Sequence, residues 1–211
     1  MSHDDLARFD FVMTSYFHVA QDIYPGTKRA YQDRVAPRFT KAHGQPPATR
    51  GEVRKAMYAD PYWQMWSALK RGNQEMSYAA RSHVLAHEFD ALEERASNAH
   101  GRRKSTLRLN PNLAVPRYVT AVDLHCMPGG YNADGGDGLY AGAMYDTASL
   151  YLATGGEFGK WNDAAGWSMV NWITTQFPGL NPKRILDLGC TVGHSTLPLA
   201  QHFAQAEVHA I

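Results

Sequence analysis

Cysteine is almost absent from this sequence, because only Cys126 and Cys190 carry a thiol among 211 residues. The two lie far apart, and neither has another cysteine near it in the sequence. A disulfide framework or a zinc ribbon needs several cysteines at short spacing, so both are excluded. Isolated thiols suit a reducing compartment, and we expect a cytoplasmic location.

An excess of charge of one sign is also missing. Lysine and arginine number 21 and aspartate and glutamate number 20, which leaves a formal net charge of +1. This balance provides no broad field that would attract nucleic acid. No apolar run approaches the ~18 residues of a membrane-spanning helix, and the N-terminus lacks a signal-peptide pattern. We therefore expect neither nucleic acid nor a membrane as a partner.

Apolar residues at helical spacing dominate the first hundred positions. They predict an amphipathic helix over residues 4–21, a second after Pro25, a short one over 49–58 and a long one over 74–98. Thr49 and Glu52 have the spacing of a capping box. Asp60 and Pro61 place a cap acceptor and a first-turn proline ahead of an aromatic, core-facing helical segment. Residues 1–100 are thus predicted to form a helical region.

Residues 101–181 have a mixed pattern. A basic loop at 101–104 precedes residues 118–125, which are rich enough in β-branched side chains to predict a strand or extended segment. Two further helices are expected, one over 139–152 and one over 162–176. We interpret this region as a linker or lid, which ends at the turn residues 178–182.

A strand-turn-helix-strand pattern follows over residues 182–211. Residues 183–188 form a short apolar strand, 189–193 a glycine turn, 194–203 a helix and 207–211 a second strand. The predicted fold class is therefore α/β: a mainly helical N-terminal region followed by one β-α-β unit.

The turn itself distinguishes between families of nucleotide-binding proteins. It contains neither the dinucleotide fingerprint nor the phosphate-loop pattern. Residues 185–193 read Ile-Leu-Asp-Leu-Gly-Cys-Thr-Val-Gly, which resembles the first motif of class I S-adenosylmethionine-dependent methyltransferases, with Thr191 where a middle glycine is common. The resemblance implies a Rossmann-like core, of which residues 182–211 are the start.

The same resemblance implies a cofactor, S-adenosylmethionine, and the residues that hold it. Asp187 would accept a hydrogen bond from the ammonium group of the ligand, directly or through water. The implied cofactor-binding residues are Asp187, Gly189, Cys190, Thr191, Gly193, His194 and Ser195. The ribose-binding acid of the family would follow Ile211, so we expect a fragment of a longer enzyme that is inactive by itself.

Methyl transfer mainly requires that the acceptor is aligned with the methyl group, and a general base is needed only for a protonated acceptor. His125 and Tyr131 are the candidate bases. The sequence does not identify the acceptor, which we expect to be a small molecule, and it leaves the oligomeric state open.

Two other interpretations compete with the transferase. Thr191 could stand at the nucleophile elbow of an α/β-hydrolase, although serine is the usual residue there. The helices could instead form a non-catalytic interaction module with a remnant cofactor fold. His83, His87 and Asp90 share one predicted helix face, but the zinc motif H-E-x-x-H is absent, and no metal is expected.

Overall fold

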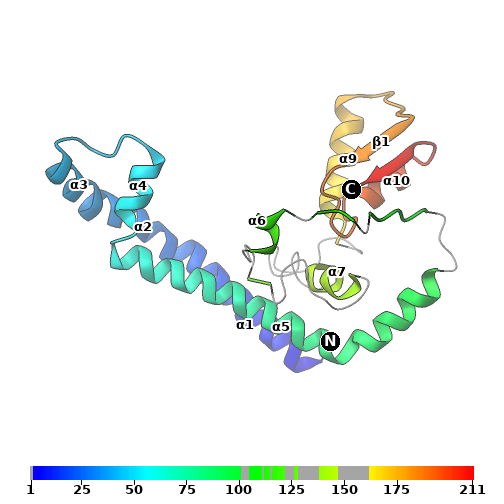
Figure 1. The fold of residues 1–211 in the computed structure, drawn as a ribbon, viewed down its shortest axis with the longest axis horizontal. Helices are drawn as coiled ribbons and strands as arrows, with labels where there is room; N and C mark the ends of the chain where they lie inside the picture. The colour runs from blue at the N-terminus through cyan, green and yellow to red at the C-terminus, as the bar shows by residue number, and fades with distance from the viewer. Residues whose placement is uncertain are drawn as a thin grey trace. The chain divides into compact units, whose positions relative to one another are not determined.

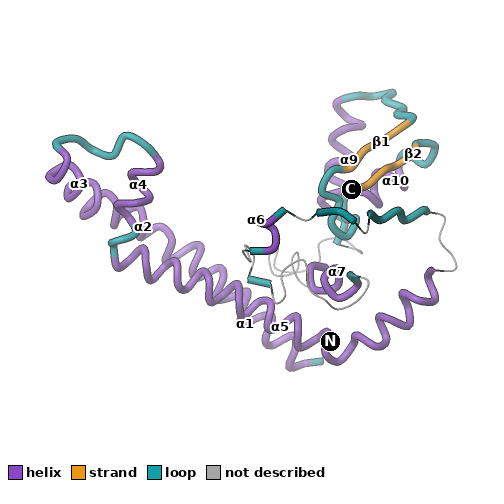
Figure 2. The backbone as a smooth tube through the Cα atoms, viewed as in Figure 1, coloured by secondary structure: helices purple, strands orange, loops and turns teal. Residues whose placement is uncertain are grey.

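The computed structural model describes residues 2–100, 105–110, 112–114, 116–121, 126–127, 138–146 and 162–211. In these ranges the chain is mainly helical and contains a two-stranded parallel sheet (Figure 2). The chain forms two compact units, Met1–His83 with Ala121–Gly130 and Val84–Thr120 with Tyr131–Ile211. One uninterrupted helix, Pro61–His100, contributes to both units.

The first unit opens with a helical run that two prolines do not interrupt (Figure 1). Its parts are α1 (His3–His18), the π-helix η1 (Val19–Ile23), α2 (Tyr24–Ala30), the π-helix η2 (Tyr31–Val35) and α3 (Ala36–His43). The sequence predicts separate helices on either side of Pro25, and the structure joins them. Pro25 and Pro37 each stand just after a π-helical segment, whose wider turn relieves the clash between a proline ring and the preceding turn.

Capping boxes open two helices of this unit. At α4 (Arg50–Met57), the Glu52 amide donates to Thr49 Oγ1 at 3.2 Å, and the Thr49 amide donates to the Glu52 carboxylate at 2.9 Å. The predicted capping box is therefore confirmed. Ser2 and Asp5 form the same arrangement at the start of α1.

Helix α5 (Pro61–His100) begins where the sequence predicts. Asp60 Oδ1 accepts hydrogen bonds from the amides of Tyr62 and Trp63 at 3.0 and 3.4 Å. The helix is continuous through Gly72, where the sequence predicts two separate segments. The expectation that its aromatic first part faces the core holds only in part, because Met65 and Leu69 are exposed.

Helix α1 and the first half of α5 run antiparallel. The pairs that join this helical run to α5 proceed in opposite chain directions: Asp5 with His83, Val12 with Asn73, and Ile23 with Tyr62. The buried side chains of the unit come from both helices and from the segments around them: Phe9, Val12, Val19, Ala30, Val35, Met57, Tyr78, Ala80 and Met127.

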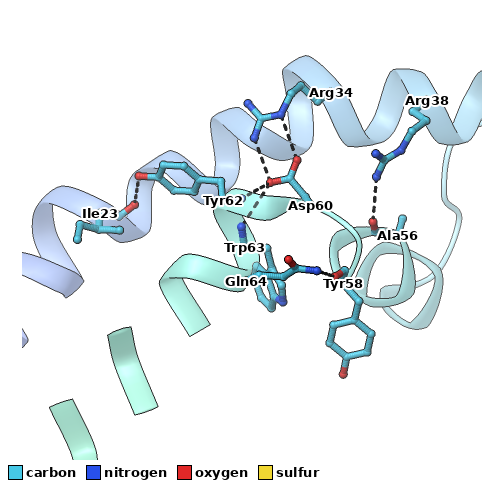
Figure 3. A network of polar contacts seen from close by, with 9 residues as sticks. All are labelled: Ile23, Arg34, Arg38, Ala56, Tyr58, Asp60, Tyr62, Trp63 and Gln64. Carbon is cyan, nitrogen blue, oxygen red and sulfur yellow. Dashed lines mark hydrogen bonds and ion pairs between the residues drawn. The ribbon is translucent and has the colours of Figure 1, made fainter. Parts of the chain in front are cut away.

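Asp60 also receives a second set of donors (Figure 3). Arg34 in η2 donates from Nε and Nη2 to the two carboxylate oxygens at 3.1 and 3.0 Å, and Asp60 is only 1% exposed. These hydrogen bonds hold the pKa of the Asp60 carboxyl below its ordinary value, although burial opposes the shift. The start of α5 is thereby fixed to η2.

In the second unit, α6 (Arg117–Thr120), α7 (Leu139–Asp146) and α9 (Ala164–Gln176) precede the sheet. The predicted strand over 118–125 is wrong at 118–120, which are helical, and 122–125 lie outside the described residues. β-Branched side chains favour a strand only where a neighbouring strand is present to pair with it. Both predicted helices are found, although 147–152 also lie outside the described residues.

Strands β1 (Arg184–Asp187) and β2 (Glu207–Ala210) pair in parallel, and α10 (Thr196–His202) lies between them in the chain. Arg184 stands opposite Glu207, and Asp187 stands opposite Ala210. The predicted β-α-β unit is confirmed, with its helix starting two residues later than predicted. Leu186 and Leu188 remain 59% and 69% exposed. Within the described ranges, no helix has the length and apolarity needed to cross a membrane.

Candidate functional site

The turn between β1 and α10 has an unusual backbone. Gly189, Thr191 and Gly193 have φ angles of 78°, 49° and 90°, in the left-handed region. Glycine adopts this region readily, whereas a β-branched residue does so at a cost. A Cβ atom at Gly189 would meet no described atom within 4 Å, so the outer side of the turn is open.

Some amides of this turn are already used within the protein. The parallel ladder extends past β1, because Gly189 and Cys190 donate to the Ile211 carbonyl at 2.6 and 3.1 Å. Gly193 donates to the Cys190 carbonyl at 2.8 Å and closes the turn. Among the described residues, the amides of Thr191 and Val192 have no acceptor and are the two donors that the turn can offer to a ligand.

Asp187 bridges the end of β1 and the start of α10. Its Oδ2 accepts hydrogen bonds from the hydroxyls of Ser195 and Thr196 at 2.8 and 2.6 Å. These bonds fix the carboxylate across the glycine turn. Its other oxygen, Oδ1, accepts no hydrogen bond from the described residues and is the acceptor that remains for a ligand.

His194 is turned toward α7. Its Nε2 donates to Asp146 Oδ1 at 2.7 Å, and Asn162 Nδ2 donates to the same oxygen at 3.0 Å and to the Asp146 carbonyl at 3.1 Å. The His194 side chain is 16% exposed and that of Asp146 is 51% exposed. This group connects the end of α7, the segment before α9 and the turn.

A glycine in α9 allows this helix to approach the turn closely, and α7 also lies near the turn. A Cβ atom at Gly166 in α9 would overlap the His194 carbonyl oxygen and lie 2.7 Å from Pro198 Cγ, so only glycine fits without movement. At Gly142 in α7, a Cβ atom would lie 3.6 Å from Val192 Cγ1. Helices α7 and α9 therefore contact the turn directly.

A pocket of about 650 Å³ lies beside the turn. Its walls come from the second half of α5, residues 107–109, α7 and Val192. Val84, Leu85 and Leu139 belong to its apolar lining, and the charged side chains of Glu88, Arg95 and Asp146 also line it. Its volume falls in the range of ~300–1,000 Å³ that is usual for small-molecule sites.

The structure brings the predicted site residues together at the end of β1, in the turn and directly before α10: Asp187, Gly189, Cys190, Thr191, Gly193, His194 and Ser195. The predicted candidate bases His125 and Tyr131 lie outside the described residues. His83 approaches Asp5, with 3.8 Å between Nε2 and Oδ1, and the described residues hold no cluster of three potential metal ligands.

The sequence analysis places Asp146 and Asn162 in helices of the predicted linker or lid region and assigns neither of them to the turn. Neither belongs to a motif, and each reaches the turn only through tertiary packing of the segments near α7 and α9. A comparison of the chain with protein-family models, with curated proteins and with solved structures found no match.

Proposed function

We propose that this chain carries the part of an S-adenosylmethionine site that binds the amino-acid end of the cofactor, in a methyltransferase with a small-molecule acceptor. The turn at 189–193 supports this proposal. It follows a strand that ends in an acid, and it precedes a parallel second strand. It has three left-handed residues and two amides for which the described residues provide no acceptor. A methyltransferase core of the Rossmann-like type would begin with such an arrangement, and this is what supports the proposal.

The polar groups at the turn suit both ends of an amino-acid moiety. The amides of Thr191 and Val192 would donate to its carboxylate, and Asp187 Oδ1 would accept from its ammonium group. Ser195 and Thr196 would keep the Asp187 carboxylate in place. The open side of Gly189 gives a ligand access to the backbone.

The cofactor supplies an electrophilic methyl group on a sulfonium, which the acceptor attacks as the carbon–sulfur bond breaks. The protein's task is to align the acceptor and exclude water. The pocket beside Val192 would perform this task with its apolar wall, and Glu88, Arg95 and Asp146 would orient polar groups of the acceptor. A mainly apolar small molecule fits this lining best.

Amide NMR spectra recorded while S-adenosylhomocysteine is added would test the proposal. We expect shifts centred on Thr191, Val192 and the neighbouring turn residues. Asp187→Asn should weaken binding by roughly tenfold, because an ionic hydrogen bond is lost. Glu207→Gln is the matched control, since Glu207 is an exposed acid at the opposite end of the same sheet.

Two outcomes would argue against the transferase. Unshifted turn amides in the folded wild-type chain would rule out this ligand site. A larger response of the same amides to NAD than to S-adenosylhomocysteine would indicate a dinucleotide site instead. If Asp187→Asn loses folded structure, Ser195→Ala offers a second test, because it removes one of the two hydroxyls that hold the Asp187 carboxylate in place.

A further inference from the structure

The first unit contains a second pocket, of about 300 Å³, between the opening helical run and α5. Its walls come from α1, η1, α2 and α5 and consist of Tyr16, Val19, Ala20, Tyr24, Trp66, Lys70, Asn73 and Gln74. All of them belong to Met1–His83, and none belongs to the glycine turn. The pocket is therefore separate from the proposed cofactor site.

Aromatic rings form much of this wall and remain accessible. The rings of Tyr24 and Trp66 are 5.2 Å apart, and Trp63 supports Trp66 from the same helix at 4.8 Å. Tyr16 and Tyr24 are 45% and 52% exposed. Exposed aromatic faces that converge on a cavity can bind a flat ring by stacking.

The polar groups of the pocket indicate which substituents a bound aromatic ligand should have. Lys70 Nζ lies 5.5 Å from the centre of the Trp66 ring and forms no ion pair with a described carboxylate. Asn73 is 5% exposed, and its Nδ2 donates to the Val12 carbonyl at 2.9 Å. Its Oδ1 receives no hydrogen bond from the described residues. Among the described residues, Lys70 thus offers the pocket a cation, and Asn73 Oδ1 offers it an acceptor.

The backbone conformation at the pocket also supports a binding site there. Val19 and Ala20 belong to the π-helical segment η1. π-Helical turns occur often at functional sites, because the extra residue displaces side chains from the regular α-helical register. Here two residues of the segment line the pocket together with Trp66 and Asn73.

We propose that this pocket binds a planar aromatic acid that carries a ring N–H or a hydroxyl group. The aromatic rings take its flat face, Lys70 pairs with its carboxylate, and Asn73 Oδ1 accepts from its donor. A cationic amine with the same ring is disfavoured by Lys70.

Calorimetric titration of the full chain with indole-3-acetate and with tryptamine tests this assignment, because the two share one ring and differ in charge. We expect saturable binding of indole-3-acetate at least tenfold tighter than that of tryptamine. Lys70→Met should remove this preference. Lys28→Met, at an exposed lysine of α2 outside the pocket, is the matched control and should preserve it.

Trp66→Leu should weaken indole-3-acetate binding by about tenfold, in line with the loss of one stacking contact. Trp172→Leu, at an exposed tryptophan of α9, should leave it unchanged. Equal affinity for the two ligands, or an unaltered preference in the folded Lys70→Met variant, would overturn the assignment, as would the absence of saturable binding. None of these results depends on the glycine turn.

Discussion

Asp60 has two structural roles that rest on one carboxylate. It caps α5 through the amides of Tyr62 and Trp63, and it accepts two hydrogen bonds from Arg34. Sequence reasoning predicts the first role, because an acid directly before a proline is a local pattern. It does not predict the second, because Arg34 is 26 positions away and reaches Asp60 only after folding.

Asp60→Asn separates these two roles, since asparagine also caps helices. We expect the free energy of unfolding at neutral pH to fall by about 2 kcal/mol, because charged hydrogen bonds from Arg34 are lost. The folded carboxyl has a lowered pKa, so its contribution is present above the unfolded pKa and disappears as the pH falls through the folded pKa.

Urea unfolding at neutral pH and below about pH 4 measures both effects of Asp60→Asn. The variant should lose less stability on acidification than the wild type. Asp22→Asn removes an exposed acid that pairs with His18, and as the control it should change stability by less than about 0.5 kcal/mol. An identical acid response of Asp60→Asn and the wild type would contradict this account.

Thr191 is a second position where a single residue affects the free energy of unfolding, here through backbone strain. Its φ of 49° is unfavourable for a β-branched side chain. Thr191→Gly should raise the free energy of unfolding by about 1 kcal/mol, because relief of strain exceeds the entropy cost of glycine. Thr14 is an exposed residue in the middle of α1, and Thr14→Gly should lower the free energy of unfolding by a similar amount. Thermal unfolding of both variants and the wild type measures these changes. A loss of stability in Thr191→Gly would show that the turn is unstrained.

At the scale of elements, the features that the sequence predicts correctly are those that depend on residues close to one another in the chain. The capping box at Thr49 and the strand-turn-helix-strand order after residue 182 depend on neighbours within a few positions, and both are found. The helical conformation of Arg117–Thr120 and the continuity of α5 through Gly72 do not follow from such local patterns. The roles of Ser195 and Thr196 at Asp187 likewise required the folded turn.

The contact between α2 and α5 can be tested with a double-mutant cycle. A Cβ atom at Gly26 would overlap the ring and hydroxyl of Tyr62, whose hydroxyl donates to the Ile23 carbonyl at 2.8 Å. We expect Gly26→Ala to cost about 3 kcal/mol in the wild-type chain, but less than about 1 kcal/mol when Tyr62→Leu removes the ring tip. Urea unfolding of the four proteins measures the coupling. Additive costs would mean that the clash is relieved elsewhere.

At the scale of the whole molecule, each unit has its own buried side chains. Phe9, Val35 and Met57 belong to the first unit, and Met144 and Val170 to the second. We therefore expect calorimetry to resolve two unfolding transitions rather than one.

Gly166→Ala should lower the midpoint of only one of these transitions, because the new methyl group would overlap the His194 carbonyl within the second unit. Gly72→Ala has open space around it in α5, so we expect this control to stabilise the first unit by up to about 1 kcal/mol. A single transition that both variants shift would show that the units unfold together.

The exposed leucines of the sheet affect how molecules behave toward one another in solution. Leu186 and Leu188 present apolar surface beside parallel strands, and a net charge of +1 gives colliding molecules little electrostatic repulsion. Self-association should therefore increase with protein concentration near neutral pH. A lysine at Leu188 would reduce it, because a charge on such a surface must be stripped of water before two copies can stack there. Light scattering over a concentration series of the wild type and Leu188→Lys would make that difference visible.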